Sequence, residues 1–204
     1  MRCFLALVIF TALAATASAA DKPPVIPAIE PPAKAPFALT DHIGKRISDA
    51  DFRGRYLLVY FGYTFCPDIC PTGLQAMAEA LDLLGPAGRR VQPLFITVDP
   101  ARDTTEVLAD YVDAFHPRLI GLTGTAAEVK AVAAAYRVRY FKLFYPWSGE
   151  EKDEKGKAIP EYAMYHTAFT YLMGPDGSGL AVFPHGAFPE DMAAEIRRAL
   201  EAKI

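Results

Sequence analysis

Short apolar runs alternate with amphipathic segments along most of the chain. Residues 56–61 (YLLVYF) form a continuous apolar run rich in β-formers, which is typical of a strand buried on both faces of a mainly parallel sheet. Apolar positions at helical spacing then predict a helix over 72–84, which Gly85 and Pro86 end. The same alternation continues and predicts strands over 91–98 and 119–122 and helices over 104–115 and 126–136.

The pattern changes towards the C-terminus. Two apolar runs, 167–173 and 179–183, flank the turn sequence Gly-Pro-Asp-Gly, and an amphipathic helix is predicted over 189–202. The charged stretch 146–161 between the two patterns is typical of a solvated loop. The order β-α-β-α-β-α followed by β-β-α indicates an α/β fold, with a central mixed β-sheet and helices on both of its faces.

The first 36 residues follow neither pattern. Residues 1–20 combine one positive charge, an apolar run and small residues near Ala19, which predicts a signal peptide or, if it is not cleaved, an N-terminal membrane anchor. Residues 21–36 contain six prolines, which predict an extended tether. We therefore expect one folded domain over 37–204, located in the bacterial periplasm and either soluble or held at the inner membrane.

Composition narrows the classes of function. A chain of 204 residues with 52% hydrophobic residues has room for one domain with a large core. The net charge of −3 leaves no basic excess to neutralise a phosphate backbone, so we expect no nucleic-acid partner. Three cysteines are too few for a disulfide scaffold, and Cys3 lies in the leader.

The remaining cysteines, Cys66 and Cys70, lie where the first buried strand leads into the first long helix. A helix N-terminus lowers the pKa of nearby thiols because its dipole and its free amide groups stabilise the thiolate. Four-residue spacing places both sulfurs on one face, close enough to form a disulfide or to share one metal ion. A purely structural disulfide is the alternative, although so short a loop would constrain the unfolded chain little.

His166 is the histidine that merits attention. It precedes the predicted strand 167–173, and a mainly parallel sheet would bring this loop to the same end as the cysteines. Two thiolates and one imidazole form a set of donors selective for copper, as Cu(I) or Cu(II). A single histidine is more often a surface or core residue, so its role stays open at this point. The other three histidines lie near turn residues and are interpreted as structural.

Three segments, in this order, resemble the Sco/SenC family. They are FGYTFCPDICP over 61–71, ITVDPARDT over 96–104, and HT at 166–167 leading into YLMGPDG over 171–177. The similarity extends over about residues 36–203. It implies a thioredoxin-like fold, in which the α/β sheet predicted above carries the two cysteines at the start of a helix.

The same resemblance implies a function and a set of site residues. The family binds copper through the two cysteines and the later histidine, which implies that Cys66, Cys70 and His166 are the ligands here. Asp99 matches an acidic position that the family keeps near the site, where it supports a ligand or contacts a partner. The implied role is that of a metallochaperone, more than an enzyme, which delivers copper to the dinuclear copper site of cytochrome c oxidase subunit II; whether it also delivers reducing equivalents stays open.

Further partners follow from that role. A chaperone needs a copper donor protein. Since a disulfide between Cys66 and Cys70 would remove the thiolates that hold the metal, a thiol reductant is also implied. The family usually has Asp directly before the histidine, whereas this chain has Tyr165. We therefore expect the imidazole to lack an acidic partner, unless Asp99 supplies the carboxylate.

Three other functions are alternatives to copper delivery. A thiol-disulfide oxidoreductase, acting on oxidase thiols or in redox signalling, would use Cys66 and Cys70 as a redox-active pair. Two features oppose this function. The cysteines are separated by three residues instead of two, and His166 stands near the position where such enzymes have a cis-proline. A peroxiredoxin-type peroxidase is disfavoured by Pro67 and Tyr63, where that motif has Thr and Pro. A passive copper-binding module would use the same ligands as a chaperone.

Overall fold

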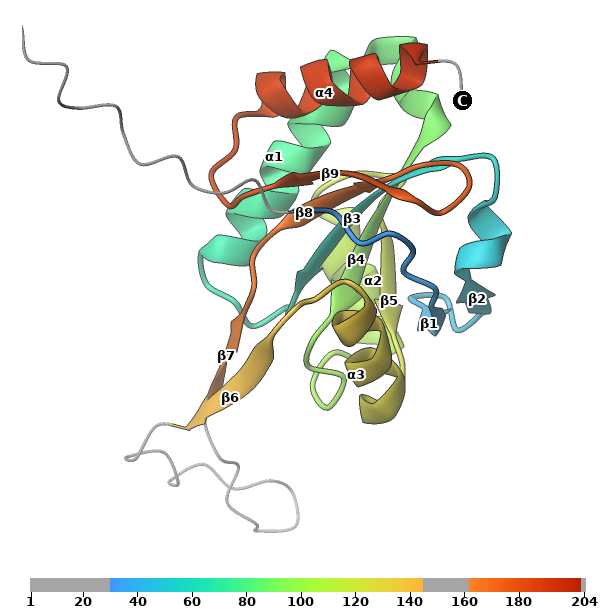
Figure 1. Ribbon diagram of the computed structural model, residues 1–204. Helices are drawn as coiled ribbons and strands as arrows, with labels where there is room; N and C mark the ends of the chain where they lie inside the picture. The colour runs from blue at the N-terminus through green and yellow to red at the C-terminus, as the bar shows by residue number, and fades with distance from the viewer. Residues whose placement is uncertain (1–29, 145–161, 203–204) are drawn as a thin grey trace, which may run out of the picture.

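A seven-stranded mixed sheet forms the centre of the molecule (Figure 1). The computed structural model describes residues 30–144 and 162–202. The strands lie in the order β2-β1-β5-β4-β3-β8-β9. Their bounds are β1 Ala38–Asp41, β2 Arg46–Ser48, β3 Tyr56–Gly62, β4 Val91–Thr97, β5 Ile120–Thr123, β8 Thr170–Met173 and β9 Gly179–Phe183. β3, β4 and β5 run parallel, and the outer strands pair antiparallel to their neighbours.

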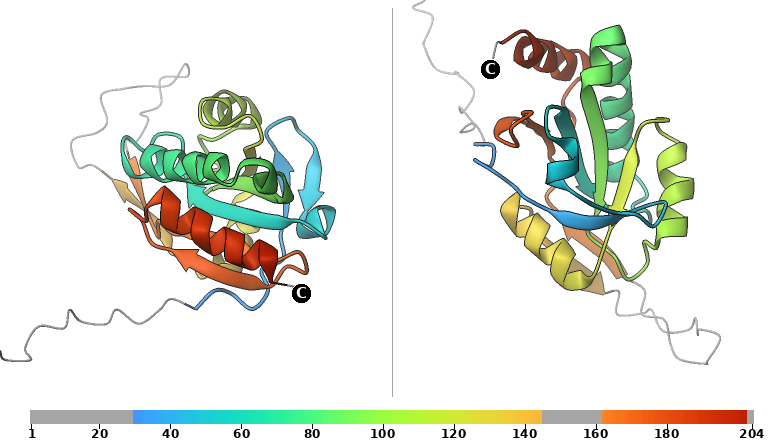
Figure 2. Two further views of the ribbon diagram at one scale, coloured as in Figure 1. Left: turned by 90° about the horizontal axis from the view of Figure 1, so that it is seen from above. Right: turned by 90° about the vertical axis from the view of Figure 1, so that its right-hand side faces the viewer.

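Helices cover both faces of this sheet (Figure 2). The described residues form the α-helices α1 Ile69–Leu83, α2 Thr105–Asp113, α3 Ala126–Ala135 and α4 Pro189–Glu201, and the short 3-10 helices η1 Asp49–Phe52 and η2 Gly85–Arg90. Successive side chains of β3 point to opposite faces of the sheet, so their contacts show which helices cover each face. Tyr60 packs under Gly73 of α1, and the Tyr56 hydroxyl donates to the Ala199 carbonyl of α4, whereas Phe61 points the other way and contacts Tyr136 after α3.

The α/β class, the central mixed sheet and the helices on both faces are as the sequence predicts. All seven residues of β3 are buried, which explains its unbroken apolar run. α1 begins at Ile69, three residues before the predicted start, so Cys70 lies in its first turn. β1 and β2 were not predicted, because strands of four and three residues carry too little alternation to be recognised.

A separate antiparallel hairpin extends from the sheet at one end (Figure 1). It consists of β6 Tyr140–Phe144 and β7 Tyr162–His166, paired so that Tyr140 lies opposite His166. The sequence predicted one strand over 167–173, and this is wrong at its start: β8 begins at Thr170, and His166 ends the separate strand β7. The hairpin escaped the sequence pattern because its two strands come from either side of the charged stretch 146–161, which lies outside the described residues.

The predicted leader, 1–20, and most of the predicted tether lie outside the described residues. The last residues of the tether, however, pack onto the domain: Pro32 and Ala35 are buried, and the Gly179 amide donates to the Pro32 carbonyl at 3.0 Å. The folded unit therefore begins about five residues before the predicted boundary at 37. Over 30–144 and 162–202, no helix has the length and apolarity needed to cross a membrane.

Replacement of Leu94 tests the burial of the central strands. Leu94 lies in the middle of β4 with no exposed surface, between β3 and β5. Leu94→Ala should lower the free energy of unfolding by about 2–5 kcal/mol, because the sheet cannot close around the cavity. Leu83→Ala, at a position that is 46% exposed, is the control and should cost less than about 1 kcal/mol. Equal losses in urea denaturation would contradict this assignment of the core.

Candidate metal site

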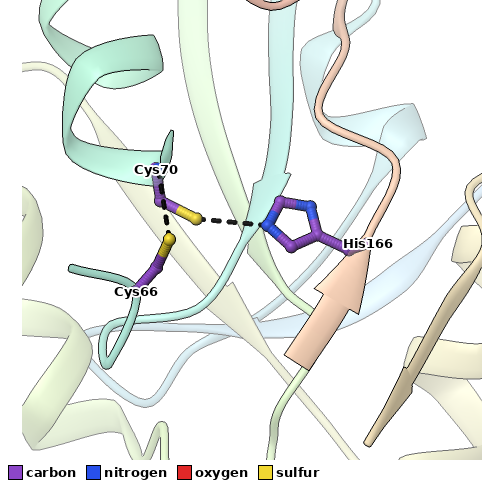
Figure 3. Close-up of side chains that lie close together, drawn as sticks. All are labelled: Cys66, Cys70 and His166. Atoms are coloured by element: carbon purple, nitrogen blue, oxygen red, sulfur yellow. Dashed lines mark hydrogen bonds between the residues drawn. The ribbon is translucent and has the colours of Figure 1, made fainter. Parts of the chain in front are cut away.

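Three segments of the chain bring the candidate ligands together beyond the carboxyl ends of β3 and β4. Cys66 lies in the loop after β3, Cys70 in the first turn of α1, and His166 at the end of β7 (Figure 3). Their two sulfurs and the nearest imidazole nitrogen all lie within 4.8 Å of one another. Bonds of about 2.3 Å to sulfur and 2.0 Å to nitrogen span up to about 4.6 Å, so one ion can reach all three atoms after a shift of a few tenths of an ångström.

Short contacts join these three residues directly. The Cys70 amide donates to the Cys66 sulfur at 3.3 Å, and the Cys70 sulfur lies 3.3 Å from Nε2 of His166. Both cysteines are free thiols. Cys70 has no exposed surface and Cys66 is 8% exposed, so the sulfurs lie below the surface while the histidine is half-buried.

The two thiols have opposite acidities. Hydrogen bonds from the Cys70 thiol and from the Cys70 amide stabilise the thiolate and lower the pKa of Cys66 to about 3, against the effect of burial. The same thiol-thiolate contact, with burial, raises the pKa of Cys70 far above its usual range. In the metal-free reduced protein, the pair therefore holds one thiolate and one thiol.

The imidazole is oriented by the backbone. Nδ1 of His166 lies 3.2 Å from the Thr167 carbonyl, which can only accept, so the proton is on Nδ1 and the lone pair of Nε2 faces the sulfurs. The rings of Tyr60 and Tyr63 meet the imidazole edge to face. A carbonyl next to the histidine thus does what a carboxylate could do.

The expectation from Tyr165 was that the imidazole lacks an acidic partner; the Thr167 carbonyl takes the place of such a partner. Alternation along β7 points Tyr165 away from the face that carries Met164 and His166. Its side chain is 56% exposed and stacks on Phe141, with ring centroids 4.9 Å apart. An aspartate at this position would face away from the imidazole as well.

Asp99 also differs from its expected role. It is only 1% exposed, so its side chain is not available to contact a partner, and no hydrogen bond joins it to a candidate ligand in the described residues. Its carboxylate accepts from the Tyr162 hydroxyl at 2.8 Å and from Nε of Arg102. Asp99 thus belongs to the structure behind the site.

Two further residues that the sequence analysis missed shape the cysteine loop. The buried Asp103 carboxylate accepts from the Thr64 hydroxyl at 2.6 Å and from the Thr97 hydroxyl, so it ties this loop to the end of β4. A Cβ atom on Gly62 would lie 2.8 Å from the Cys70 sulfur, so only glycine leaves room for the thiol there. Asp103 could have been found from its place in the motif VDPARD, whereas nothing in the sequence indicated the role of Gly62.

A surface groove gives access to the candidate ligands. It is lined by Cys66 and His166 together with residues of the helix start and of the hairpin, and His185 lies on its margin. Phe65 and Tyr165 are 60% and 56% exposed near this opening. The arrangement offers two soft sulfur donors and one nitrogen to an ion that enters from the groove.

Comparisons with known proteins agree with the geometry. The family model described as SCO1/SenC matches residues 28–201. Human "Protein SCO1 homolog, mitochondrial" is 43% identical over 163 residues, which are 79% of this chain and 50% of that protein. "Protein sco1" of Schizosaccharomyces pombe is 41% identical, over 78% of this chain and 58% of its own length. The chain thus spans little more than half the length of these relatives.

Solved structures show the same fold. "Structure of Bradyrhizobium japonicum ScoI with copper bound" aligns with a TM-score of 0.69 at 39% identity, over 81% of this chain and 98% of the other. "Crystal Structure of Yeast Sco1 with Copper Bound" aligns with a TM-score of 0.72 at 34% identity, over 85% and 91%. The thioredoxin-like fold that the sequence resemblance implied is confirmed.

The predicted location is contradicted. The curated relatives from human and other organisms are named as mitochondrial proteins, and they point to mitochondria rather than to a bacterial periplasm. The leader was interpreted as a secretory signal because it carries one arginine where a transit peptide has several, and this composition alone does not fix the compartment.

Alkylation of the reduced, metal-free protein tests the thiol acidities. Because the lowered pKa keeps Cys66 ionised above pH 3, its rate with iodoacetamide should be flat between about pH 5 and pH 8, whereas an ordinary thiol reacts about tenfold faster per pH unit. Cys70, buried and protonated, should stay unmodified. Peptide mass spectrometry locates the label, and a Cys66 rate that rises steadily with pH would contradict the assignment.

Proposed function

This chain belongs to the SCO1/SenC family, and on that premise we propose that it binds copper through Cys66, Cys70 and His166 and acts in the assembly of cytochrome c oxidase. The observation that carries the proposal is the convergence of the three donor atoms within 4.8 Å, from three separate segments of the fold. Copper is the cargo in this proposal, to be bound and passed on.

The chemistry of the donors favours copper. Structural zinc sites are closed by four protein ligands, whereas this cluster offers three. Two soft sulfurs suit Cu(I), and the imidazole adds a donor that also suits Cu(II). The Sco structures described above contain copper, in a bacterial and a yeast protein of 39% and 34% identity.

We propose the dinuclear copper domain of oxidase subunit II as the receiver, with a copper donor protein and a thiol reductant as further partners. The groove beside Cys66 and His166 supports this, because an acceptor ligand can reach the ion without unfolding the site. The reductant is required because only reduced thiols can hold the metal.

A thiol-disulfide oxidoreductase acting on oxidase thiols is the second candidate. The observation that favours it is the acidity of Cys66 beside a buried, protonated Cys70, since an accessible thiolate next to a resolving thiol is the arrangement that disulfide exchange uses. Both functions need the same cysteines, but only copper delivery needs His166 as a ligand.

For the N-terminal region, we propose a leader over 1–20 that is cleaved or serves as an anchor, and a proline-rich spacer that ends where Pro32 meets β9. The single charge and apolar run of the leader and the prolines after it support this. Mass determination of the N-terminus of the mature protein tests the cleavage. A mature chain that starts at Met1 and is not held at a membrane would contradict both forms of the proposal.

Histidine replacement tests the ligand set. The reduced protein should bind one copper ion, and its Cu(II) form should be coloured by thiolate-to-copper charge transfer. His166→Ala should remove most of this colour while Cu(I) binding persists on the thiolates, and replacement of either cysteine should abolish binding. His185→Ala is the control, because His185 lies on the same groove but outside the cluster. Full colour in His166→Ala, or its loss in His185→Ala, would overturn the assignment.

A transfer experiment separates the two functions. Reduced, copper-loaded protein is mixed with the metal-free copper domain of subunit II, and copper and thiols are followed on both proteins. A chaperone transfers copper, and His166→Ala impairs the transfer. In a parallel mixture the target domain starts with its two cysteines joined in a disulfide: an oxidoreductase then forms a disulfide between Cys66 and Cys70 as the target disulfide is reduced to two thiols, and His166→Ala leaves that exchange intact.

A further inference from the structure

We propose that Arg102 is a positioning residue that holds the cysteine loop and the histidine strand together, and so sets the distance between Cys66 and His166. The proposal rests on the proposed function only in naming these two residues as ligands. The Arg102 side chain contacts both the cysteine loop and the start of β7, and no backbone hydrogen-bond ladder joins these two segments.

On one side, Arg102 holds the start of β7. Its guanidinium carbon lies 3.8 Å from the centre of the Tyr162 ring, and Nη1 donates to the Tyr162 carbonyl at 3.0 Å. The Tyr162 hydroxyl in turn donates to the Asp99 carboxylate, which also accepts from Nε of Arg102. Tyr162 is the first residue of the strand that ends at His166.

On the other side, Arg102 contacts the cysteine loop. Its guanidinium carbon lies 4.7 Å from the centre of the Phe65 ring and 5.7 Å from that of Tyr63. Phe65 directly precedes Cys66 and is 60% exposed, so few other contacts fix its ring. A cation over an aromatic face is attracted to it, which restrains this part of the loop.

The hairpin needs such a restraint. Among the described residues, β6 and β7 pair only with each other and form a sheet separate from the central one. The backbone hydrogen bond from Thr167 to the Arg139 carbonyl closes the base of the hairpin but does not join it to the cysteine loop. Side chains must therefore fix the hairpin against that loop, and Arg102 contacts both.

Arginine is suited to this position for a physical reason. Its planar guanidinium can stack on aromatic rings with its faces while its edges donate to Asp99 and to the Tyr162 carbonyl, whereas a lysine ammonium cannot do both. Asp99 is 1% exposed, and it fixes the cation from the end of β4. Charge alone would not reproduce the contact, so Arg102→Lys is the informative substitution.

The experiment measures amide hydrogen exchange in the reduced, metal-free protein. Arg102→Lys should speed exchange about tenfold or more both in β7 and at Cys66, whose amide donates to the Tyr63 carbonyl, because hydrogen bonds to charged groups are worth that order of stabilisation. Tyr162→Phe removes only the hydroxyl bond to Asp99 and should speed exchange in β7 alone.

Arg118→Lys is the matched control. Arg118 is also partly buried and donates to a backbone carbonyl, that of Val91 at 2.9 Å, but it precedes β5 at the opposite end of the sheet. It should leave exchange in both site segments unchanged. Faster exchange in Arg102→Lys confined to β7, or equal to that of Arg118→Lys, would overturn the proposal.

A spectroscopic readout shows whether the metal site follows the same contact. With Cu(II) bound, Arg102→Lys should shift or weaken the thiolate charge-transfer band and Arg118→Lys should not, at matched folding by circular dichroism. An unchanged band in a folded Arg102→Lys protein would contradict the positioning of the ligands. If the wild-type protein shows no band, the copper proposal fails, and hydrogen exchange still decides the role of Arg102.

Discussion

Complete burial of β3 is the constraint on which the rest of the structure depends. All seven of its residues are buried. Helices α1 and α4 cover one face of the strand and the segment that follows α3 covers the other, so the chain leaves the core only where the strand ends. The chain emerges there at Gly62, turns through the cysteine loop and starts α1. Both cysteines are thereby fixed at the edge of the core, where Gly62 packs against the Cys70 sulfur.

The histidine reaches the same place by a different route. It comes from a hairpin outside the central sheet, and its imidazole meets the Cys70 sulfur at 3.3 Å. One half of the site is therefore rigid by burial, while the other is held by side chains such as Tyr162 and Arg102. A site made of one buried part and one part held by side chains can admit and release an ion without disturbing the core, in keeping with the proposed transfer of copper.

The ionisable groups around the site have two different roles. The pKa of Cys66 is lowered because hydrogen bonds stabilise its thiolate, and the thiolate is the form that binds a metal or takes part in disulfide exchange. The buried carboxylates of Asp99 and Asp103 lie behind the ligands, where they hold the hairpin and the cysteine loop. The sequence resemblance implied that Asp99 supports a ligand or contacts a partner, whereas the structure buries its carboxylate and bonds it to Tyr162 and Arg102.

The sequence by itself determined the α/β class, most of the core strands and helices, and the two cysteines, because hydrophobic periodicity and four-residue spacing are local properties of the chain. It could not determine β7, which pairs with β6 across a charged stretch, nor the role of Thr167, whose carbonyl orients the imidazole. The opposite acidities of Cys66 and Cys70 were equally out of reach. The hairpin joins residues far apart in the chain, and the imidazole orientation and the thiol acidities depend on exact distances and burial, so all of these features are set only by the tertiary structure.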